Sequence, residues 1–233
     1  MDVVTARAER ALEILRQADA LAETGAVSLA TSLSAEDMVI TDLIARHGLR
    51  IGLFAIDTGM LHAETLAMIA ALEDRYALAV RLVRPDPEAV AALIGRQGAY
   101  AFYDSLEARQ ACCHVRKVIP LAAALQGHAG WVTGQRRDAA ASRSGLAEVE
   151  TDPVRGIAKF NPLAAWSFDD VMAYAGQHDL PVSPLYGRGY RSIGCEPCTR
   201  ALKPGEDIRA GRWWWEQDGA RKECGLHVAE TVS

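Results

Sequence analysis

Short apolar runs alternate with segments of helical periodicity along most of the chain, and this alternation is the strongest constraint on its fold. The apolar runs predict buried strands at 27–31, 51–56, 78–83 and 131–133. Helices are predicted at 5–23, 35–47, 62–76, from the prolines at 85 and 87 to about 97, after Cys113, and at 168–178. Strands that alternate with helices in this way favour an α/β domain with a largely parallel sheet flanked by helices.

The predicted topology also predicts where a ligand binds. In open α/β sheets, ligands bind in the crevice beyond the carboxyl ends of the strands. Residues 32–34, 57–59 and 134–137 follow predicted strands and are therefore expected to line one crevice. Backbone amides and the hydroxyls of Ser32 and Ser34, at the start of a helix, are suited to hold an anion there.

Composition narrows the classes of function. A chain of 233 residues, half of them hydrophobic, fits one globular domain. The net charge of −5 argues against a general affinity for nucleic acid or for membrane surfaces, because both require a positive field. Basic residues are nevertheless clustered at 116–117, 136–137 and 209–212, which suits a small anionic ligand. The sequence shows neither an apolar run of about 18 residues nor a signal core, so we expect a cytoplasmic protein.

The cysteines point to a metal centre. Five cysteines in a reducing compartment favour metal binding or catalysis over disulfides. The adjacent pair Cys112–Cys113 and the Cys195-x-x-Cys198 pair together make a complete ligand set of four thiolates. Neighbouring side chains diverge, so the adjacent pair suits a bulky cubane better than a single zinc ion. Structural zinc, or a role as inert buried thiols for the adjacent pair, remains an alternative.

The fifth cysteine is the predicted nucleophile. A helix-breaking Lys-Pro-Gly sequence at 203–205 separates a domain at 1–202 from a polar C-terminal tail at 203–233, which we expect to be mobile. Cys224 lies in this tail, where Lys222 and His227 could stabilise its thiolate. The alternative is an incidental exposed thiol, which would be a liability for the protein.

Several motifs extend this interpretation and carry a resemblance over residues 31–227. They are Asp57-Thr58-Gly59, Cys112-Cys113-His114-Val115-Arg116-Lys117, Thr133-Gly134-Gln135-Arg136-Arg137, Lys159-Phe160-Asn161-Pro162-Leu163, the Ser192–Arg200 segment, Gly211-Arg212-Trp213-Trp214-Trp215-Glu216 and Lys222-Glu223-Cys224-Gly225-Leu226-His227. Together they resemble the assimilatory adenylyl-sulfate and phosphoadenylyl-sulfate reductases. The sequence departs from the family at the Ser32–Asp37 loop, which has alanine where the family often has glycine.

The resemblance implies an adenine nucleotide α-hydrolase-like fold and a thioredoxin-dependent reduction of adenosine 5′-phosphosulfate to sulfite and AMP in assimilatory sulfate reduction. It implies Cys224 as the nucleophile that forms an S-sulfocysteine, and thioredoxin or a similar dithiol protein as the electron donor. It also implies a [4Fe–4S] cluster, which in this family accompanies a preference for the substrate without a 3′-phosphate. The cluster ligands would be Cys112, Cys113, Cys195 and Cys198.

The resemblance also assigns the substrate contacts. Lys117, Arg209, Arg212 and His227 would surround the phosphosulfate. Arg136 and Arg137, with Arg143, would serve the nucleotide end. The alternatives are a 3′-phosphoadenylyl-sulfate reductase, an ATP pyrophosphatase-like sulfurtransferase that holds iron–sulfur or zinc, and a zinc-bound nucleotide sensor without an enzymatic role. A homo-oligomer is compatible with the sequence.

Overall fold

The protein is built around one sheet of six strands, in the order β3-β2-β1-β4-β6-β5. This architecture is seen in a computed structural model that describes residues 3–216. Strands β1, β2, β3, β4 and β6 run parallel, and β5 pairs antiparallel with β6. The strands are β1 (Ala26–Thr31), β2 (Gly52–Ile56), β3 (Val80–Val83), β4 (His128–Val132), β5 (Val149–Thr151) and β6 (Ala158–Phe160). The predicted α/β fold with a largely parallel sheet is therefore confirmed.

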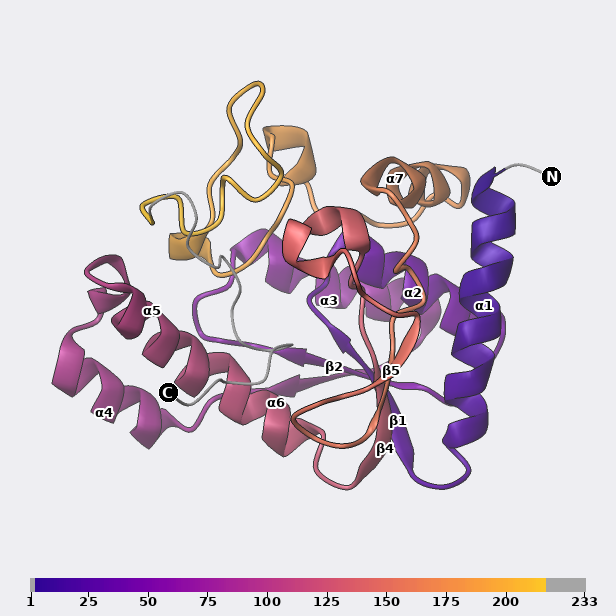
Figure 1. The fold of residues 1–233 in the computed structure, drawn as a ribbon, viewed down its shortest axis with the longest axis horizontal. Helices are drawn as coiled ribbons and strands as arrows, with labels where there is room; N and C mark the ends of the chain where they lie inside the picture. Colours follow the sequence, from indigo (N-terminus) through magenta and orange to yellow (C-terminus); the bar gives the residue numbers. More distant parts are fainter. Residues whose placement is uncertain (1–2, 217–233) are drawn as a thin grey trace.

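The predicted helices are all present, and the structure adds one helix, α5, that was not predicted. The helices are α1 (Val3–Leu21), α2 (Ala35–Arg46), α3 (Ala63–Tyr76), α4 (Pro87–Gln97), α5 (Leu106–Cys113), α6 (Ile119–Ala124) and α7 (Phe168–Gln177) (Figure 1). The predicted helix after Cys113 is present, as a π-helical turn at His114–Val118 that continues into α6. Helix α5 was not predicted; it begins at Leu106 and carries both adjacent cysteines in its last turn. The Ser105 hydroxyl starts this helix by accepting a hydrogen bond from the Ala108 amide.

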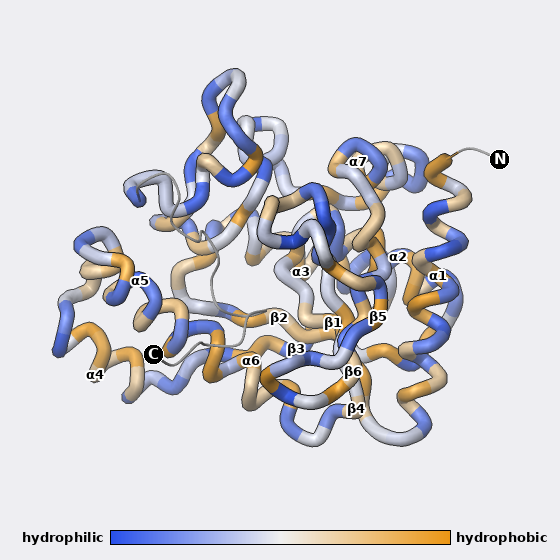
Figure 2. Tube along the Cα trace, viewed as in Figure 1, coloured by the Kyte–Doolittle hydropathy of each residue, from blue (hydrophilic) through white to orange (hydrophobic). Residues whose placement is uncertain are grey.

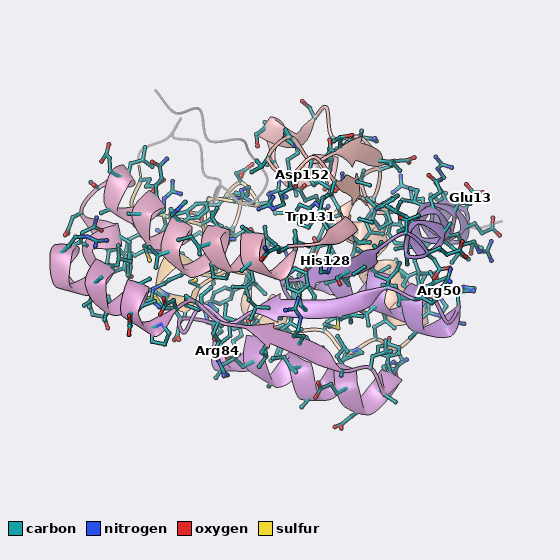
Figure 3. The ribbon with its side chains drawn as sticks, turned by 90° about the horizontal axis from the view of Figure 1, so that it is seen from below. Glu13, Arg50, Arg84, His128, Trp131 and Asp152 are labelled. Carbon is teal, nitrogen blue, oxygen red and sulfur yellow. The ribbon has the colours of Figure 1, made fainter. Side chains whose placement is uncertain are left out.

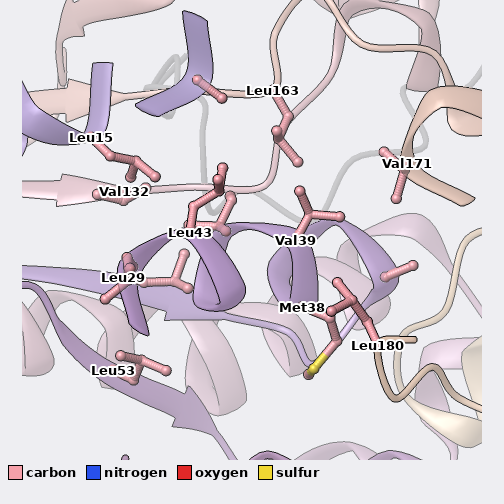
Figure 4. Packing of buried hydrophobic residues seen from close by; sticks show 14 of the residues in the cluster. Leu15, Leu29, Met38, Val39, Leu43, Leu53, Val132, Leu163, Val171 and Leu180 are labelled. Carbon is pink, nitrogen blue, oxygen red and sulfur yellow. The ribbon is translucent and has the colours of Figure 1, made fainter. Parts of the chain in front are cut away.

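Side chains of alternate strand residues pack on opposite faces of the sheet. Leu53 of β2 packs with Leu29, Val39 and Leu43 in the main core, to which α1, α2, α3 and α7 contribute (Figure 4). Phe54, the next residue of β2, packs instead in a smaller core together with α6 and β4, whose buried residues include Leu121 and Trp131. The sheet is therefore covered on both faces, as its apolar strands require (Figure 2).

The smaller core contains a buried aromatic ring with polar neighbours. The Trp131 indole donates a hydrogen bond to Asp152 Oδ2 at 3.1 Å, and both side chains are labelled in Figure 3. Asp152 also pairs with Arg155 at 2.9 Å. These contacts hold the segment between β5 and β6 against β4. Strands β5 and β6, which the sequence did not predict, form this end of the sheet.

Residues 190–216 lie beyond the sheet, next to α5 and far from α1 (Figure 1). A backbone bridge between Thr199 and Arg212 folds this segment back on itself. A second bridge, between Leu61 and Cys195, attaches it to the chain after β2. Within the described part of the chain, none of the helices combines the length and the apolar character needed to cross a membrane.

Candidate functional site

A cavity of about 250 Å³ lies at the carboxyl ends of β1, β2 and β4. This is the edge of the sheet at which the sequence predicted a crevice. Its walls include Ser32, Ser34, Thr58, Lys117, Gly134, Gln135, Arg136, Arg143, Arg209 and Arg212. Of the predicted crevice residues, Asp57, Gly59 and Arg137 are not among the lining residues.

The loop after β1 is organised around a carboxylate. Asp37 Oδ2 accepts hydrogen bonds from the Ser32 amide at 2.6 Å, the Ser32 hydroxyl at 2.7 Å and the Ser34 hydroxyl at 3.2 Å. The intervening Leu33 has a φ of +62°, a left-handed conformation that a bulky residue seldom adopts. Side-chain hydrogen bonds therefore shape this loop, which has no glycine, and the sequence alone did not point to this role for Asp37.

The Asp37 carboxyl is almost completely buried. Burial raises its pKa to about 6, even though the hydrogen bonds from Ser32 oppose this rise. Its second oxygen lies so close to Gly134 that a β-carbon at that position would collide with it. Gly134 thus allows the loop after β4 to approach the loop after β1.

The two arginines predicted to bind the nucleotide, Arg136 and Arg137, lie in different places after β4. Arg136 is 1% exposed and its Nε donates to Glu36 Oε1 at 2.9 Å. It also pairs with Asp138. The Arg137 Nε donates to the Leu146 carbonyl at 2.8 Å, outside the cavity wall. The structure therefore places Arg136 at the cavity, with carboxylate partners, and Arg137 away from it.

Basic side chains gather at the cavity wall formed by the chain after residue 190. Arg212 is 7% exposed, and its Nη1 donates to the Ser192 hydroxyl at 3.4 Å. Its guanidinium lies against Gly194, where a β-carbon would be 2.5 Å from Nη2. Arg209 and Lys117 line the same cavity. Buried cations at a cavity wall are suited to bind an anion.

The four predicted cysteine ligands line one smaller cavity beside the first. Cys112 and Cys113 come from the end of α5, and Cys195 and Cys198 from the loop before and within a short 3₁₀ turn at Glu196–Cys198. Cys113, Cys195 and Cys198 are buried. The Thr58 hydroxyl, from the Asp-Thr-Gly motif, lies 3.2 Å from the Cys195 sulfur. Residues that are far apart in sequence are thus brought to a common site.

The four thiols at this site form a donor set that fits an iron–sulfur cluster. Within residues 3–216, no group of three potential ligands is arranged to hold one ion. Four thiols are the donor set that cubane clusters use. In addition, Arg116 Nε, Arg212 Nε and Trp213 Nε1 are buried with no hydrogen-bond acceptor among the described residues. The site is therefore rich in donors and short of negative charge, as a binding site for an anionic group would be.

The thiols do not have equal acidity. Burial raises the pKa of Cys112, and it raises the pKa of Cys198 to about 12. Burial also opposes ionisation of Cys195, but the Lys117 charge and the Thr58 hydroxyl outweigh it and lower the pKa of this thiol. Lys117 and Cys195 both line the large cavity and the small one. These two residues therefore form a wall that the two cavities share, and the Lys117 charge acts on a thiol of the small cavity.

The structure brings together most, though not all, of the predicted site residues. Ser32, Ser34, Lys117, Arg136, Arg209 and Arg212 line the large cavity, and the four cysteines line the small one. Cys224 and His227 lie outside the described residues. Of the consecutive tryptophans, Trp213 is fully buried beside Cys113 and Cys198, whereas Trp214 is 49% exposed.

Comparisons with solved structures agree with this architecture. The chain resembles phosphoadenylyl-sulfate reductase from Candida auris with a TM-score of 0.67 and 24% identity, over 80% of this chain and 88% of that one. It resembles the NH₃-dependent NAD synthetase from Campylobacter jejuni with a TM-score of 0.54 and 12% identity, over 83% of this chain and 80% of that one. Both comparisons support the predicted adenine nucleotide α-hydrolase-like fold.

Sequence comparisons identify the family. A profile of the phosphoadenosine phosphosulfate reductase domain matches residues 26–201. The adenosine 5′-phosphosulfate reductase of Burkholderia cepacia is 54% identical over 87% of this chain and 80% of its own length. That of Allochromatium vinosum is 47% identical over 98% of this chain and 88% of its own length. The chain therefore belongs to the phosphoadenosine phosphosulfate reductase domain family, and the prediction of an oxidoreductase that acts on a sulfur group is confirmed at the level of that family.

Proposed function

We propose that this protein reduces adenosine 5′-phosphosulfate to sulfite and AMP, with electrons from thioredoxin or a similar dithiol protein, in the cytoplasm. The observation that carries the proposal is the wall that Lys117 and Cys195 share between a cation-lined cavity and four thiols. The relatives from Burkholderia cepacia and Allochromatium vinosum, whose names specify the same substrate, support it.

The cavity suggests how the substrate binds. Lys117, Arg209 and Arg212 would hold the phosphosulfate, because charge-assisted hydrogen bonds to phosphate and sulfate oxygens are strong in a partly desolvated cavity. Ser32, Ser34 and Arg143 would contact the nucleotide. Arg136 would act on the nucleotide from its ion pair with Glu36. The proposal assigns His227 to the phosphosulfate, but that residue lies outside the described part of the chain.

The chemistry begins with nucleophilic attack by Cys224, which also lies outside the described residues. Its thiolate forms a bond to the sulfate sulfur, the bond between that sulfur and the bridging oxygen breaks, and AMP leaves with the oxygen. The product on the enzyme is an S-sulfocysteine. A thiolate of the dithiol protein then attacks the Cys224 sulfur and displaces sulfite. The second thiol displaces Cys224 and restores its thiol, so the dithiol becomes a disulfide and supplies both electrons.

The four cysteines at the small cavity would hold a [4Fe–4S] cluster. When bound, the cluster would supply a structural and electrostatic contribution, because the thiols already provide both electrons. Lys117 would hold the substrate anion on one side while it contacts Cys195 on the other. The protein's own part is thus to orient the anion and keep water away from the buried wall.

Anaerobic purification followed by iron, sulfide and sulfite-release assays tests the proposal. We expect about four irons per chain, as a cubane cluster requires, and thioredoxin-dependent sulfite release from adenosine 5′-phosphosulfate in preference to the 3′-phosphorylated nucleotide. Zinc without iron would favour the nucleotide sensor instead. Preference for the 3′-phosphorylated nucleotide would favour the alternative reductase.

The covalent step has a separate test. Mixing the enzyme with substrate, but without a dithiol, should give one sulfonate adduct that peptide mass spectrometry locates on Cys224. Cys224→Ser should carry no adduct and release no sulfite, while its iron content equals that of the wild type. An adduct that persists in Cys224→Ser would contradict the proposed nucleophile.

A further inference from the structure

A buried ion pair connects the helix that carries Cys112 and Cys113 to the chain beyond Cys198. Arg109 lies on α5, four residues before Cys113, so the two side chains share one side of the helix. Its Nε donates to Glu216 Oε1 at 2.7 Å and its Nη2 donates to Glu216 Oε2 at 3.2 Å. The side chains are only 1% and 7% exposed. This is the two-pronged geometry of a strong arginine–carboxylate contact.

Trp213 extends this connection to the second cysteine pair. The Arg109 guanidinium carbon lies 4.3 Å from the centre of the Trp213 ring, which is fully buried. The Trp213 amide donates to the Cys198 carbonyl at 3.1 Å. Arg109 itself borders the small cavity. One guanidinium therefore contacts the segment that holds Cys198 while its helix holds Cys113.

The two cysteine pairs come from segments that no continuous secondary structure joins. Their relative position is therefore set by tertiary contacts, which include the Leu61–Cys195 bridge and the contacts between α5 and the chain around Cys198 and Trp213. A desolvated ion pair is suited to this, because removal of one partner breaks a buried contact between α5 and residues 213–216 and favours local opening. By contrast, the exposed Arg188–Glu64 pair, whose side chains are 60% and 26% exposed, contributes little.

We propose that Arg109 and Glu216 are positioning residues that clamp residues 213–216 against α5 and thereby hold the two cysteine pairs around one cavity. Neither residue is proposed to be a ligand or to touch the substrate. The inference rests on the proposed function where it concerns the cluster, but the packing of the four thiols can be tested without it.

The test compares Glu216→Gln and Arg109→Lys with the wild-type full-length protein, purified without oxygen. Loss of the absorbance of the cluster is followed after addition of an iron chelator. Because loss of the two-pronged Arg109–Glu216 contact favours opening of the cavity, we expect Glu216→Gln to lose the cluster at least ~10-fold faster than the wild type. Arg109→Lys keeps the positive charge but cannot make the two-pronged contact, so its rate of cluster loss should lie between those of the wild type and Glu216→Gln. Unchanged rates in both variants would overturn the inference.

Two controls separate positioning from general stability. Glu64→Gln removes a partner from an exposed pair and should lose the cluster at the wild-type rate. Val171→Ala, in the main core, should lower the melting temperature without changing that rate. If Val171→Ala accelerates cluster loss as much as Glu216→Gln does, the ion pair acts only through stability and the inference fails.

A second readout applies even if the wild type contains no iron, an outcome that would overturn the cluster proposal alone. Alkylation of the full-length chain, followed by peptide mapping, then reports the accessibility of Cys113 and Cys198. We expect both cysteines to react at least ~10-fold faster in Glu216→Gln than in the wild type or Glu64→Gln. Equal alkylation in all three proteins would overturn the positioning role.

Discussion

The Arg212 guanidinium lies directly against Gly194, so closely that a β-carbon at residue 194 would be 2.5 Å from Arg212 Nη2. Gly194 immediately precedes Cys195, whose thiol lies beside Lys117. The glycine therefore allows one cation to reach the large cavity from the same segment that supplies a thiol to the small one.

This contact predicts the effect of Gly194→Ala. The added methyl group would displace Arg212 from the cavity wall, so we expect sulfite release to fall by ~10²-fold, the effect typical of losing one charge-stabilising group. Gly176→Ala is the matched control, because a β-carbon at that helical position meets no atom within 4 Å. That variant should retain wild-type activity. Steady-state kinetics decide, and normal activity in Gly194→Ala would contradict a substrate role for Arg212.

Lys117 is predicted to matter for both cavities. Lys117→Ala should reduce sulfite release by ~10²-fold, because it removes a buried charge from the proposed anion site. Lys203→Ala, at an exposed position, should leave the rate unchanged. The measurement is sulfite release with saturating and limiting nucleotide. A wild-type rate in Lys117→Ala would remove this residue from the site.

The buried Asp37 carboxyl should make the free energy of unfolding fall as the pH rises from about 4 to 6. Because burial raises its pKa in the folded protein to about 6, the folded state binds this proton more tightly than the unfolded state does. The stabilising contribution is fully present below the unfolded pKa near 4 and is lost as the pH rises through 6. The free energy of unfolding of the wild type, relative to Asp37→Asn, should therefore fall by up to about 3 kcal/mol between pH 4 and 6. Urea titrations at several pH values test this, and a pH-independent difference would contradict it.

Arg136 is predicted to stabilise the fold as well as line the cavity. Arg136→Met leaves Glu36 without its buried partner and should lower the free energy of unfolding by about 3 kcal/mol. Adding Glu36→Gln should recover part of that loss. Arg84→Met, which breaks an exposed pair with Asp57, should cost less than about 1 kcal/mol. If Arg136→Met loses activity at unchanged stability, a direct nucleotide contact is the better explanation.

The sequence predicted the central strands well because their apolar residues are consecutive and buried on both faces of the sheet. Strands β5 and β6 were missed because each has only three residues, too few for a periodic signal. Their pairing is decided by contacts with β4 and by the buried Asp152, which are visible only in the fold.

Helix α5 was also missed. The sequence predicts a helix after Cys113, where the π-helical turn and α6 lie, but it predicts none before it, where the Ser105 cap starts α5 at Leu106. This difference changes the site, because Arg109 and Cys113 then occupy the same helix.

By itself, the sequence determined the alternation of the central strands with their helices, the edge of the sheet at which the cavity forms and the residue types of the site. These follow from local periodicity and from motifs whose residues are close in the chain. Only the tertiary structure decided that Arg136 lies at the cavity and Arg137 does not, that Asp37 organises the first loop, and that Glu216 meets Arg109. Each of these depends on which buried charge meets which partner across the fold, and such long-range pairing leaves no periodic signal in the sequence.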